Sequence, residues 1–321
     1  MNGTTLSGPG RLRVAVVGGG ANSEHDVSLA SAAAVAAALP RSSYDVVPVT
    51  VTRCGGWQDH GGRPLGVLGA VALLSSCDVV FPAVHGSGGE DGTIAALCEL
   101  AGLPCVGSPA PAGATAMDKH LTKLVAVAAG VRVAAGRLVT PSTAPDLAWT
   151  DPVVVKPVAA GSSQGVSLVE HAADLEPALK EAFLHGERVL VEEVVHGREI
   201  DVAVLGTADG ERVVAPALEI VGPGIFDYAT KYGGAADLRV PAQITRDEED
   251  QLSAAAVRMY DALGCRGLAR IDFFLTTDGP VLLEVNTMPG LTEHSQAPRM
   301  FAAAGIAYPE LLDRMVADAL R

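Results

Sequence analysis

The chain has 321 residues, of which 49% are hydrophobic and 19% charged, and its formal net charge is −14. This length suits one large domain or two to three smaller ones, and the composition excludes disorder or a fibrous fold for the bulk of the chain. The acidic balance argues against a nucleic-acid or anionic-membrane surface, although a few local cations could still bind a small anion.

The five cysteines are scattered, odd in number and without CxxC spacing. They predict small core residues in a reducing compartment rather than a disulfide framework or a zinc site. Only four apolar residues in a row, 14–17, precede the glycine run 18–20, and no uncharged apolar stretch reaches transmembrane length. We therefore expect a cytoplasmic protein with a disordered tail over residues 1–13.

Strands and helices alternate in residues 14–117, which predicts a parallel α/β layer as the N-terminal domain. Short β-branched runs that end at glycine indicate buried strands, and alanine-rich runs that end at proline or glycine indicate helices. The predicted strands cover residues 12–17, 45–52, 78–83 and 104–107, and the predicted helices cover 28–39 and 92–101. The glycine-rich stretch 54–72 is expected to be an irregular insertion.

From residue 118 onward, strands in hairpin-like order with helices to one side predict two α+β modules, over residues 118–198 and 199–321. In the first module the predicted strands are 153–157, 166–169 and 188–195, and the predicted helices are 119–129 and 175–184. In the second the predicted strands are 199–205, 213–220, 269–275 and 281–285, and the helices are 247–263 and the tail after residue 295. The fold class is therefore α/β followed by α+β.

Charged and amide side chains interrupt two apolar strands near the C-terminus. Arg270 and Asp272 share one face of the first strand, and Glu284 and Asn286 share one face of the second, because residues two apart point the same way. If the strands are neighbours, their oxygens form a site suited to Mg²⁺ held together with phosphates. A buried salt-bridge cluster explains the same pattern equally well.

A lysine and a Gly/Ser loop follow the strand at 153–157. Lys156 offers a point charge and the loop at 161–165 offers backbone N–H donors, a combination suited to phosphate. The loop also fits the G-x-S-x-G pattern of hydrolases, but a strand-like segment follows it where a nucleophile elbow requires a helix. A plain flexible turn is the alternative interpretation.

Acidic residues and a histidine lie at the ends of the N-terminal strands. Gly18 and Gly20 match part of a dinucleotide fingerprint, but Ser23 stands at the third glycine position. Glu24 enters a helix, which it could cap, or it could bind a substrate ammonium.

The stretch 85–92 follows a strand and opens a helix. For Glu90 and Asp91 we favour helix capping over chemistry. His85, at the strand end, leaves both a structural and a chemical role open.

The long loop after Pro223 carries aromatic residues and Lys231 between glycines. Such a loop is typical of a lid, here over a nucleotide. Only five lysines occur in the chain, and three of them, Lys119, Lys156 and Lys231, fall in the segments discussed above.

Together these segments resemble the D-alanine–D-alanine ligase family of the ATP-grasp superfamily. The resemblance runs from about residue 14 to residue 320, and seven motifs occur in the family's order. They lie at residues 23–28, 85–92, 117–119, 161–165, 227–232, 270–272 and 284–290. The resemblance implies an ATP-grasp fold, in which a preATP-grasp N-terminal domain precedes two α+β modules that sandwich ATP.

The resemblance also implies how ATP and its metals are bound. Lysines would contact the phosphates, acidic and backbone groups the adenine and ribose, and two strands the metals. The residues for ATP would be Lys119, Lys156, Ser162, Ser163, Glu192, Glu193, Val194, Val195, Glu199 and Lys231. Two Mg²⁺ ions would be held by Asp272, Glu284 and Asn286, with Mn²⁺ as an alternative metal. A monovalent cation is a further candidate cofactor.

For the amino-acid substrates, the resemblance implies a binding set of Glu24, Val27, His85, Arg270, Gly290, Ser295 and Gln296. The implied catalytic set is Glu24, Ser162, Tyr232, Arg270, Gly290 and Ser295. Glu24 would receive the first ammonium and would close the lid with Ser162 and Tyr232. Arg270 and the Gly290 N–H would stabilise the oxyanion, and Ser295 would bind the second carboxylate.

The implied reaction joins two D-alanines through an acyl phosphate, with release of ADP and phosphate, for peptidoglycan precursors. A homodimer without nucleic-acid or membrane partners is expected by the same analogy.

Two departures from the family pattern concern substrate choice. Gln296 occupies a position where an apolar or larger residue is common, and Ala159 and Ala160 replace a more polar pair. Gln296 could hydrogen-bond a polar acceptor, but we favour a side chain that points to solvent. Tyr232 disfavours a D-lactate acceptor. The alternative functions are a paralogous ligase with another acceptor and, less favoured, a non-catalytic nucleotide-binding regulator.

Overall fold

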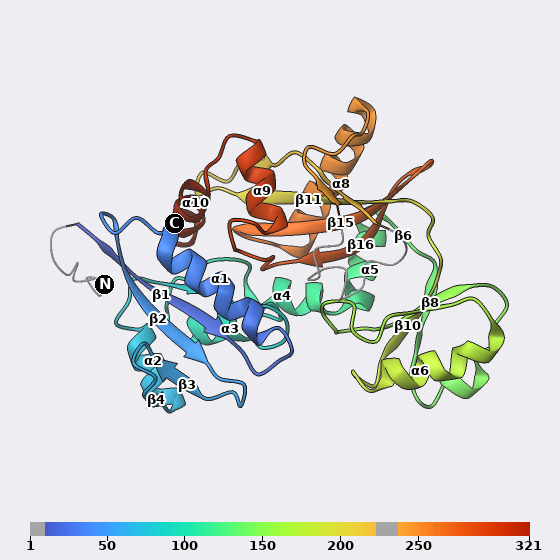
Figure 1. Cartoon of the computed structure of the whole chain (residues 1–321), viewed down its shortest axis with the longest axis horizontal. Coiled ribbons are helices and arrows are strands. Elements are labelled where there is room, and N and C mark those ends of the chain that lie inside the picture. Colours follow the sequence, from blue (N-terminus) through green and yellow to red (C-terminus); the bar gives the residue numbers. More distant parts are fainter. Residues whose placement is uncertain (1–9, 223–236) are drawn as a thin grey trace.

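The structure, a computed structural model, describes residues 10–222 and 237–321. Three sheets with covering helices form a mixed α/β molecule, which confirms the predicted fold class (Figure 1). The N-terminal sheet lies at the lower left of Figure 1, a small central sheet at the lower right and the C-terminal sheet at the top. The predicted N-terminal tail falls mostly outside the described residues.

The N-terminal sheet has the strand order β4-β3-β2-β1-β5, and β1 runs parallel to β2 and β5. Its elements are β1 (Leu12–Gly19), α1 (His25–Ala38), β2 (Tyr44–Val51), β3 (Trp57–Asp59), β4 (Pro64–Leu65), α2 (Val67–Leu74), β5 (Val79–Pro82) and α3 (Thr93–Leu100). Helix α1 lies close against β1 because Gly18 has no side chain: a Cβ atom there would lie 2.5 Å from the Cβ of Ala32. The predicted parallel layer is confirmed.

Two local predictions in this domain are wrong. The stretch 54–72 is ordered, since β3 and β4 form a hairpin beside β2 and α2 follows it. Its glycines lie in the turns between these very short elements, so a high glycine content did not mean irregular structure. The predicted strand at 104–107 is reduced to a single bridge between Cys105 and Val80.

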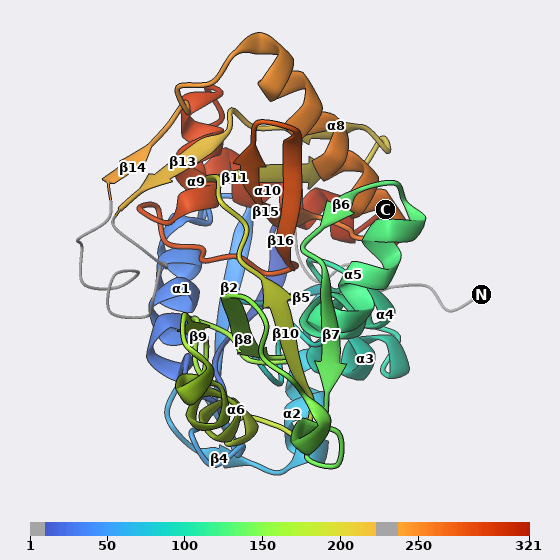
Figure 2. The same cartoon turned by 90° about the vertical axis from the view of Figure 1, so that its right-hand side faces the viewer.

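The central sheet is antiparallel and has the order β7-β10-β8-β9. Its strands are β7 (Gly136–Val139), β8 (Val153–Pro157), β9 (Ser167–Val169) and β10 (Val189–Glu193), and α6 (Leu175–Phe183) packs against it. Short 3-10 turns occur at η1 (Ala144–Asp146) and η2 (Ala172–Asp174). Figure 2 shows β8 and β10 below β15 and β16 of the C-terminal sheet.

The C-terminal sheet has the order β14-β13-β11-β15-β16-β6, with β12 beside β11. Its strands are β6 (Arg132–Val133), β11 (Arg198–Gly206), β12 (Arg212–Val214), β13 (Leu218–Val221), β14 (Asp237–Arg239), β15 (Leu268–Thr276) and β16 (Gly279–Asn286). The helices α4 (Ala110–Met117), α5 (Lys119–Ala128) and α8 (Arg246–Leu263) pack against it, and α9 (Gln296–Ala303) and α10 (Tyr308–Ala319) follow it in the chain. The antiparallel register of β11, β15 and β16 positions the charged side chains analysed below.

Two elements predicted in the C-terminal third are divided in the structure. The strand expected at 213–220 is split into β12 and β13 around Pro216, which has no N–H for the sheet ladder. The tail expected as one helix forms α9 and α10, separated at Gly305, whose φ of 84° is unfavourable for other residues.

The segment at residues 110–133 packs on the C-terminal sheet rather than on the central one. Helices α4 and α5 contact β16 and α8, and β6 pairs in parallel with β16. The prediction did not include α4 or β6. The domain boundaries at residues 117 and 198 stay a prediction.

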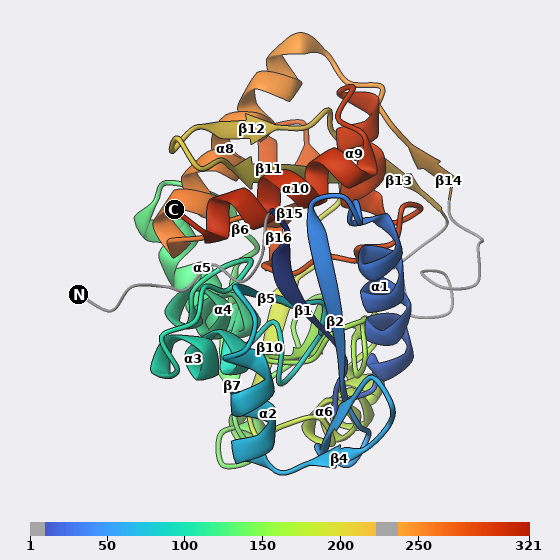
Figure 3. The same ribbon diagram turned by 90° about the vertical axis from the view of Figure 1, so that its left-hand side faces the viewer.

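Helix α10 joins the N-terminal and C-terminal sheets through one hydrophobic core. Its buried face, including Leu312 and Met315, lies in the same cluster as Val14 and Phe81 of the N-terminal sheet and Leu268 of β15. Figure 3 shows α10 between the N-terminal sheet and the C-terminal sheet. The relative position of these two sheets therefore depends on how α10 packs.

All five cysteines are free, and Cys77, Cys98 and Cys265 are buried as predicted, whereas Cys54 is exposed. In the part of the chain that the structure describes, no helix combines the length and apolar character needed to cross a membrane.

We expect Met315→Ala to lower the free energy of unfolding by about 2–5 kcal/mol, because it leaves a cavity in the core shared by the two sheets. Urea unfolding of both variants would measure this. Arg314→Ala, one residue earlier and partly exposed, is the matched control and should cost at most about 0.5 kcal/mol. Equal costs for the two variants would contradict this role of α10.

Candidate functional site

A cavity of about 570 Å³ lies where the three sheets approach one another. The loops after β1, β5, β8 and β16 line it, together with the polar ends of β15 and β16. It brings together eleven of the predicted site residues: Glu24, Val27, His85, Lys119, Ser162, Arg270, Glu284, Asn286, Gly290, Ser295 and Gln296. Residues from about position 24 to position 296 thus meet around one space.

Three carboxylates form a row across the C-terminal sheet. Asp201 of β11 lies directly opposite Asp272 of β15, and Asp272 lies opposite Glu284 of β16. Arg270 and Asn286 form the next row on the same face, since they are two residues away along their strands. The register shift after Asp272 is an irregularity of the kind that often occurs beside active sites.

Arg270, in the next row, is the cation that pairs with two of these carboxylates. Its Nε and Nη2 atoms donate to the two oxygens of Asp272, each at 2.7 Å, and Nε lies 3.4 Å from Asp201 Oδ2. Burial works against the charged guanidinium, but Asp272 and Asp201 hold the pKa of Arg270 well above its usual value. Arg270 is therefore a permanent positive charge in the wall of the cavity.

The side chains of β15 and β16 that were predicted as metal ligands contact Lys119 and one another. Lys119 Nζ lies 3.2 Å from Glu284 Oε2, and Asn286 Nδ2 donates to Asp272 Oδ2 at 3.0 Å. Within residues 10–222 and 237–321, no three His, Cys, Asp or Glu side chains cluster as ligands for one metal ion. Two carboxylates and one amide suit Mg²⁺, which is commonly bound by few protein groups together with phosphate.

Glu24 and Ser162 join the N-terminal domain to the Gly/Ser loop. Ser162 Oγ donates to Glu24 Oε1 at 2.7 Å. The carboxylate of Glu24 fits between two glycines, because a Cβ on Gly86 or Gly161 would lie 2.5 or 2.6 Å from Oε2. The sequence left two roles open for Glu24, capping of α1 and binding of an ammonium group. Its side chain makes no capping hydrogen bond to α1. Glu24 instead lines the cavity.

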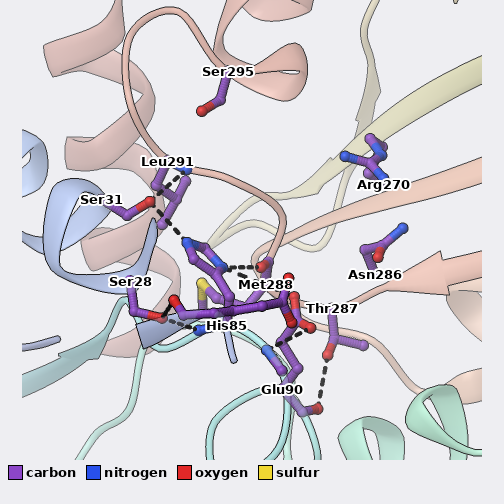
Figure 4. Close-up of polar contacts among 12 residues, drawn as sticks. Ser28, Ser31, His85, Glu90, Arg270, Asn286, Thr287, Met288, Leu291 and Ser295 are labelled. Atoms are coloured by element: carbon purple, nitrogen blue, oxygen red, sulfur yellow. Dashed lines mark hydrogen bonds and ion pairs between the residues drawn. The ribbon is translucent and has the colours of Figure 1, made fainter. Parts of the chain in front are cut away.

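His85 ties the N-terminal sheet to the loop after β16 (Figure 4). Its Nδ1 lies 2.8 Å from the Met288 carbonyl oxygen, which can only accept, so Nδ1 carries the proton. Nε2 then accepts from Ser31 Oγ at 2.7 Å, and the Leu291 N–H donates to the same Oγ at 3.2 Å. Burial lowers the pKa of His85. A neutral His85 thus positions the loop that carries Gly290.

Glu90 is a cavity residue that the sequence interpretation assigned to capping. Asp91 accepts the N–H of Thr93, the first residue of α3, and that of Gly88, whereas the N-cap position itself is Gly92. Glu90 instead receives the Gly86 N–H at 3.0 Å, and its side chain is largely enclosed, with 15% of its surface exposed. Burial and the nearby Glu24 raise the pKa of Glu90 to about 8. Its place beside His85 in one loop was the only signal for this position.

Two predicted ATP ligands, Glu192 for the base and Lys156 for the phosphates, are not part of the cavity lining and meet Lys123 of α5 at the central sheet. Lys156 Nζ is 2.8 Å from Glu192 Oε2, and Lys123 bonds the other Glu192 oxygen. The two lysines outweigh the effect of burial and lower the pKa of Glu192. Sequence reasoning missed Lys123, whose only signal was its spacing of one helical turn from Lys119.

The remaining predicted ATP ligands lie on β10, on β11, after β10 and in the Gly/Ser loop. Glu193 accepts the Ala135 N–H at 2.8 Å, so its side chain is engaged by the backbone. Val194 and Val195 follow β10, Ser163 lies in the Gly/Ser loop and Glu199 lies on β11. Their roles stay predictions. Lys231 and Tyr232 lie outside the described residues, together with the predicted lid.

The favoured orientation of Gln296 is wrong. Its side chain does not point to solvent, because Oε1 accepts from Arg270 Nη1 at 2.6 Å and Nε2 donates to Asp201 Oδ2 at 2.9 Å. Ser295 Oγ accepts the Thr292 N–H at 3.1 Å and borders the cavity. The strong charges of Arg270 and Asp201, which lie far away in the sequence, orient the amide.

Comparisons with known proteins agree with this geometry. The chain matches the families described as D-ala D-ala ligase N-terminus, over residues 13–68 and 64–108, and D-ala D-ala ligase C-terminus, over residues 145–317. It is 41% identical to the D-alanine–D-alanine ligase of Mycolicibacterium smegmatis, with 97% of this chain and 96% of that protein covered.

Two solved structures share the whole fold. The VanG D-Ala:D-Ser ligase from Enterococcus faecalis is 33% identical, with a TM-score of 0.86 over 96% of this chain and 99% of that one. The D-alanine–D-alanine ligase from Bacillus anthracis, complexed with ATP, is 26% identical, with a TM-score of 0.81 over 97% and 98% of the two chains.

The raised pKa of Glu90 predicts a pH dependence of stability. Between its ordinary pKa of 4.5 and its folded value of about 8, the folded protein keeps a proton that the unfolded chain releases. The wild type should therefore lose stability relative to Glu90→Gln as the pH rises from 5 to 8. Urea unfolding at several pH values would measure the difference. A difference that stays constant over this range would show that Glu90 is ionised in the fold, and Glu99→Gln on α3 is a matched control.

Proposed function

Since this chain belongs to the D-alanine–D-alanine ligase family, we propose that it joins two D-alanines to D-alanyl-D-alanine while ATP is converted to ADP and phosphate. The product would serve as a peptidoglycan precursor. The observation that carries the proposal is the single cavity where Glu24 and Ser162 face Arg270, Lys119 and Glu284. In this cavity Glu24 would anchor an ammonium group, and Arg270 and Lys119 would offset the charge of phosphate and of an oxyanion.

ATP would lie between the central and C-terminal sheets. The relative complexed with ATP supports the binding of ATP itself. Lys119 pairs with Glu284 and Lys156 with Glu192, so both lysines would supply positive charge along the ATP site, and Glu192 would lie at the adenine edge. Asp272, Glu284 and Asn286 would hold Mg²⁺, which when bound would neutralise phosphate charge.

The first step would form an acyl phosphate. A carboxylate oxygen of the first D-alanine, whose ammonium is held by Glu24, attacks the γ-phosphorus. The bond to the bridging oxygen breaks, and ADP leaves with the electron pair. Lys119 is positioned to offset charge on the transferred group.

The second step would form the peptide bond. The amine of the second D-alanine attacks the acyl carbon, the C–O bond to phosphate breaks, and the amine loses a proton. Arg270 and the Gly290 N–H both border the cavity where the oxyanion would develop. Exclusion of water by a closed lid would protect the acyl phosphate from hydrolysis.

A second candidate is the same reaction with D-serine as acceptor. The likeness to the VanG D-Ala:D-Ser ligase favours it over other acceptors. A cytoplasmic location and a homodimer stay predictions from the sequence.

Amino-acid-dependent ADP release with Mg·ATP tests the proposal. D- and L-amino acids are supplied singly and in pairs, and the products are identified by mass. We expect D-alanyl-D-alanine to dominate, whereas a dominant D-alanyl-D-serine would establish the second candidate. No stimulation by any D-amino acid would refute both.

Arg270→Lys should keep ATP binding and lose most turnover, which distinguishes an enzyme from a nucleotide-binding regulator.

We expect Gly161→Ala to raise the KM for the first D-alanine about tenfold, because the new methyl group displaces the Glu24 carboxylate and breaks its bond to Ser162. Thermal unfolding should change little, because the methyl group meets the end of a flexible side chain rather than the backbone. Steady-state kinetics would measure both KM values. Gly66→Ala, with nothing within 4 Å of the new Cβ, is the matched control. An unchanged KM in Gly161→Ala would remove Glu24 from the first subsite.

A further inference from the structure

Asp201 is a buried carboxylate to which neither the sequence motifs nor the proposed reaction gives a role. Its side chain is fully buried in β11, directly opposite Asp272. The carboxylates of Asp272 and Glu284 continue the same row. Like charges directly opposite one another destabilise a sheet, so a third carboxylate in this row needs a physical explanation.

The explanation lies in a closed set of three side chains: Asp201, Arg270 and Gln296. Asp201 Oδ2 lies 3.4 Å from Arg270 Nε and accepts from Gln296 Nε2 at 2.9 Å. Gln296 Oε1 in turn accepts from Arg270 Nη1 at 2.6 Å. The amide can take only this orientation, because its oxygen must face the guanidinium and its N–H the carboxylate.

These contacts differ from the other contacts of Arg270. The guanidinium also bonds both oxygens of Asp272, the residue that we assign to Mg²⁺. Asp201 and Gln296 hold Arg270 without belonging to that proposed ligand set. They can therefore keep the guanidinium in place while the oxygens of Asp272 are shared with another cation.

We propose that Asp201 and Gln296 are positioning residues that hold the Arg270 guanidinium toward the cavity for the peptide-forming step. This inference rests on the proposed function. Gln296 lies at the first position of α9, directly after Ser295, and thus links the second-substrate subsite to the oxyanion cation. Its amide is engaged in holding Arg270, so its main contribution is to the rate of joining rather than to the choice of acceptor.

Two variants test the role by kinetics. Asp201→Asn removes the charge at constant shape, and Gln296→Met removes both hydrogen bonds at similar length. We expect each to lower kcat at least about tenfold, the effect of losing a hydrogen bond to a charged group, with less than a twofold change in the Kd for ATP. The ratio of D-alanine to D-serine incorporation should stay the same. Asp278→Asn and Gln251→Met, at exposed positions of the β15–β16 turn and α8, are matched controls.

Double variants that also carry Arg270→Lys distinguish a positioning role of Asp201 and Gln296 from a general loss of structure. In an Arg270→Lys background, Asp201→Asn and Gln296→Met should each cost less than twofold, because the group that they hold is already gone. Equal costs in both backgrounds would overturn the inference, as would an unchanged kcat in both single variants. Because Gln296 is only partly buried, Gln296→Met keeps the test available if Asp201→Asn does not fold.

A measurement independent of turnover distinguishes this inference from the proposed function. The Arg270 guanidinium N–H resonances, assigned by their loss in Arg270→Lys and including the Nη1 protons that face Gln296, should exchange with water at least about tenfold faster in both variants than in the wild type. If the wild type makes no dipeptide, the proposed function fails, yet faster exchange would still support the positioning role. Exchange as slow as in the wild type would overturn it.

Discussion

The charge balance across β11, β15 and β16 constrains the rest of the site. Asp201, Asp272 and Glu284 face one another in register, which is unfavourable unless cations lie between them. Arg270 and Lys119 supply two positive charges, one from the sheet itself and one from α5. Three carboxylates and two cations leave one net negative charge on this face. A bound Mg²⁺ would offset this charge, so the arrangement that costs stability is suited to a metal ion.

The neutral His85 links this charged face to the N-terminal domain. Because His85 is buried with a lowered pKa, it acts through directed hydrogen bonds to Met288 and Ser31 rather than through charge. The loop carrying Gly290 thereby takes its position from two different domains. The core around α10 supports the same arrangement with apolar contacts. The arrangement of the residues that line the cavity therefore depends on side-chain packing in the core around α10, outside the cavity.

The anionic groups near Glu24 need a different explanation. Glu24 and Glu90 approach the same loop, and two ionised carboxylates there would repel each other. The raised pKa of Glu90 resolves this conflict, because Glu90 stays protonated near neutral pH while Glu24 bonds Ser162. One acidic residue can then serve as an anchor for an ammonium group and the other as a neutral part of the wall.

The sequence by itself determined most strands and helices, the family, and eleven residues that meet in the cavity, because these follow from local periodicity and from motifs in a fixed order. The tertiary structure alone decided the contacts of Asp201, Lys123 and Glu90 and the orientation of Gln296. Each of these depends on a partner brought close by folding: Gln296 contacts Asp201 and Arg270, which lie 95 and 26 positions away. Electrostatic fields and hydrogen bonds act through space, and no local pattern records which distant charge a buried side chain will meet.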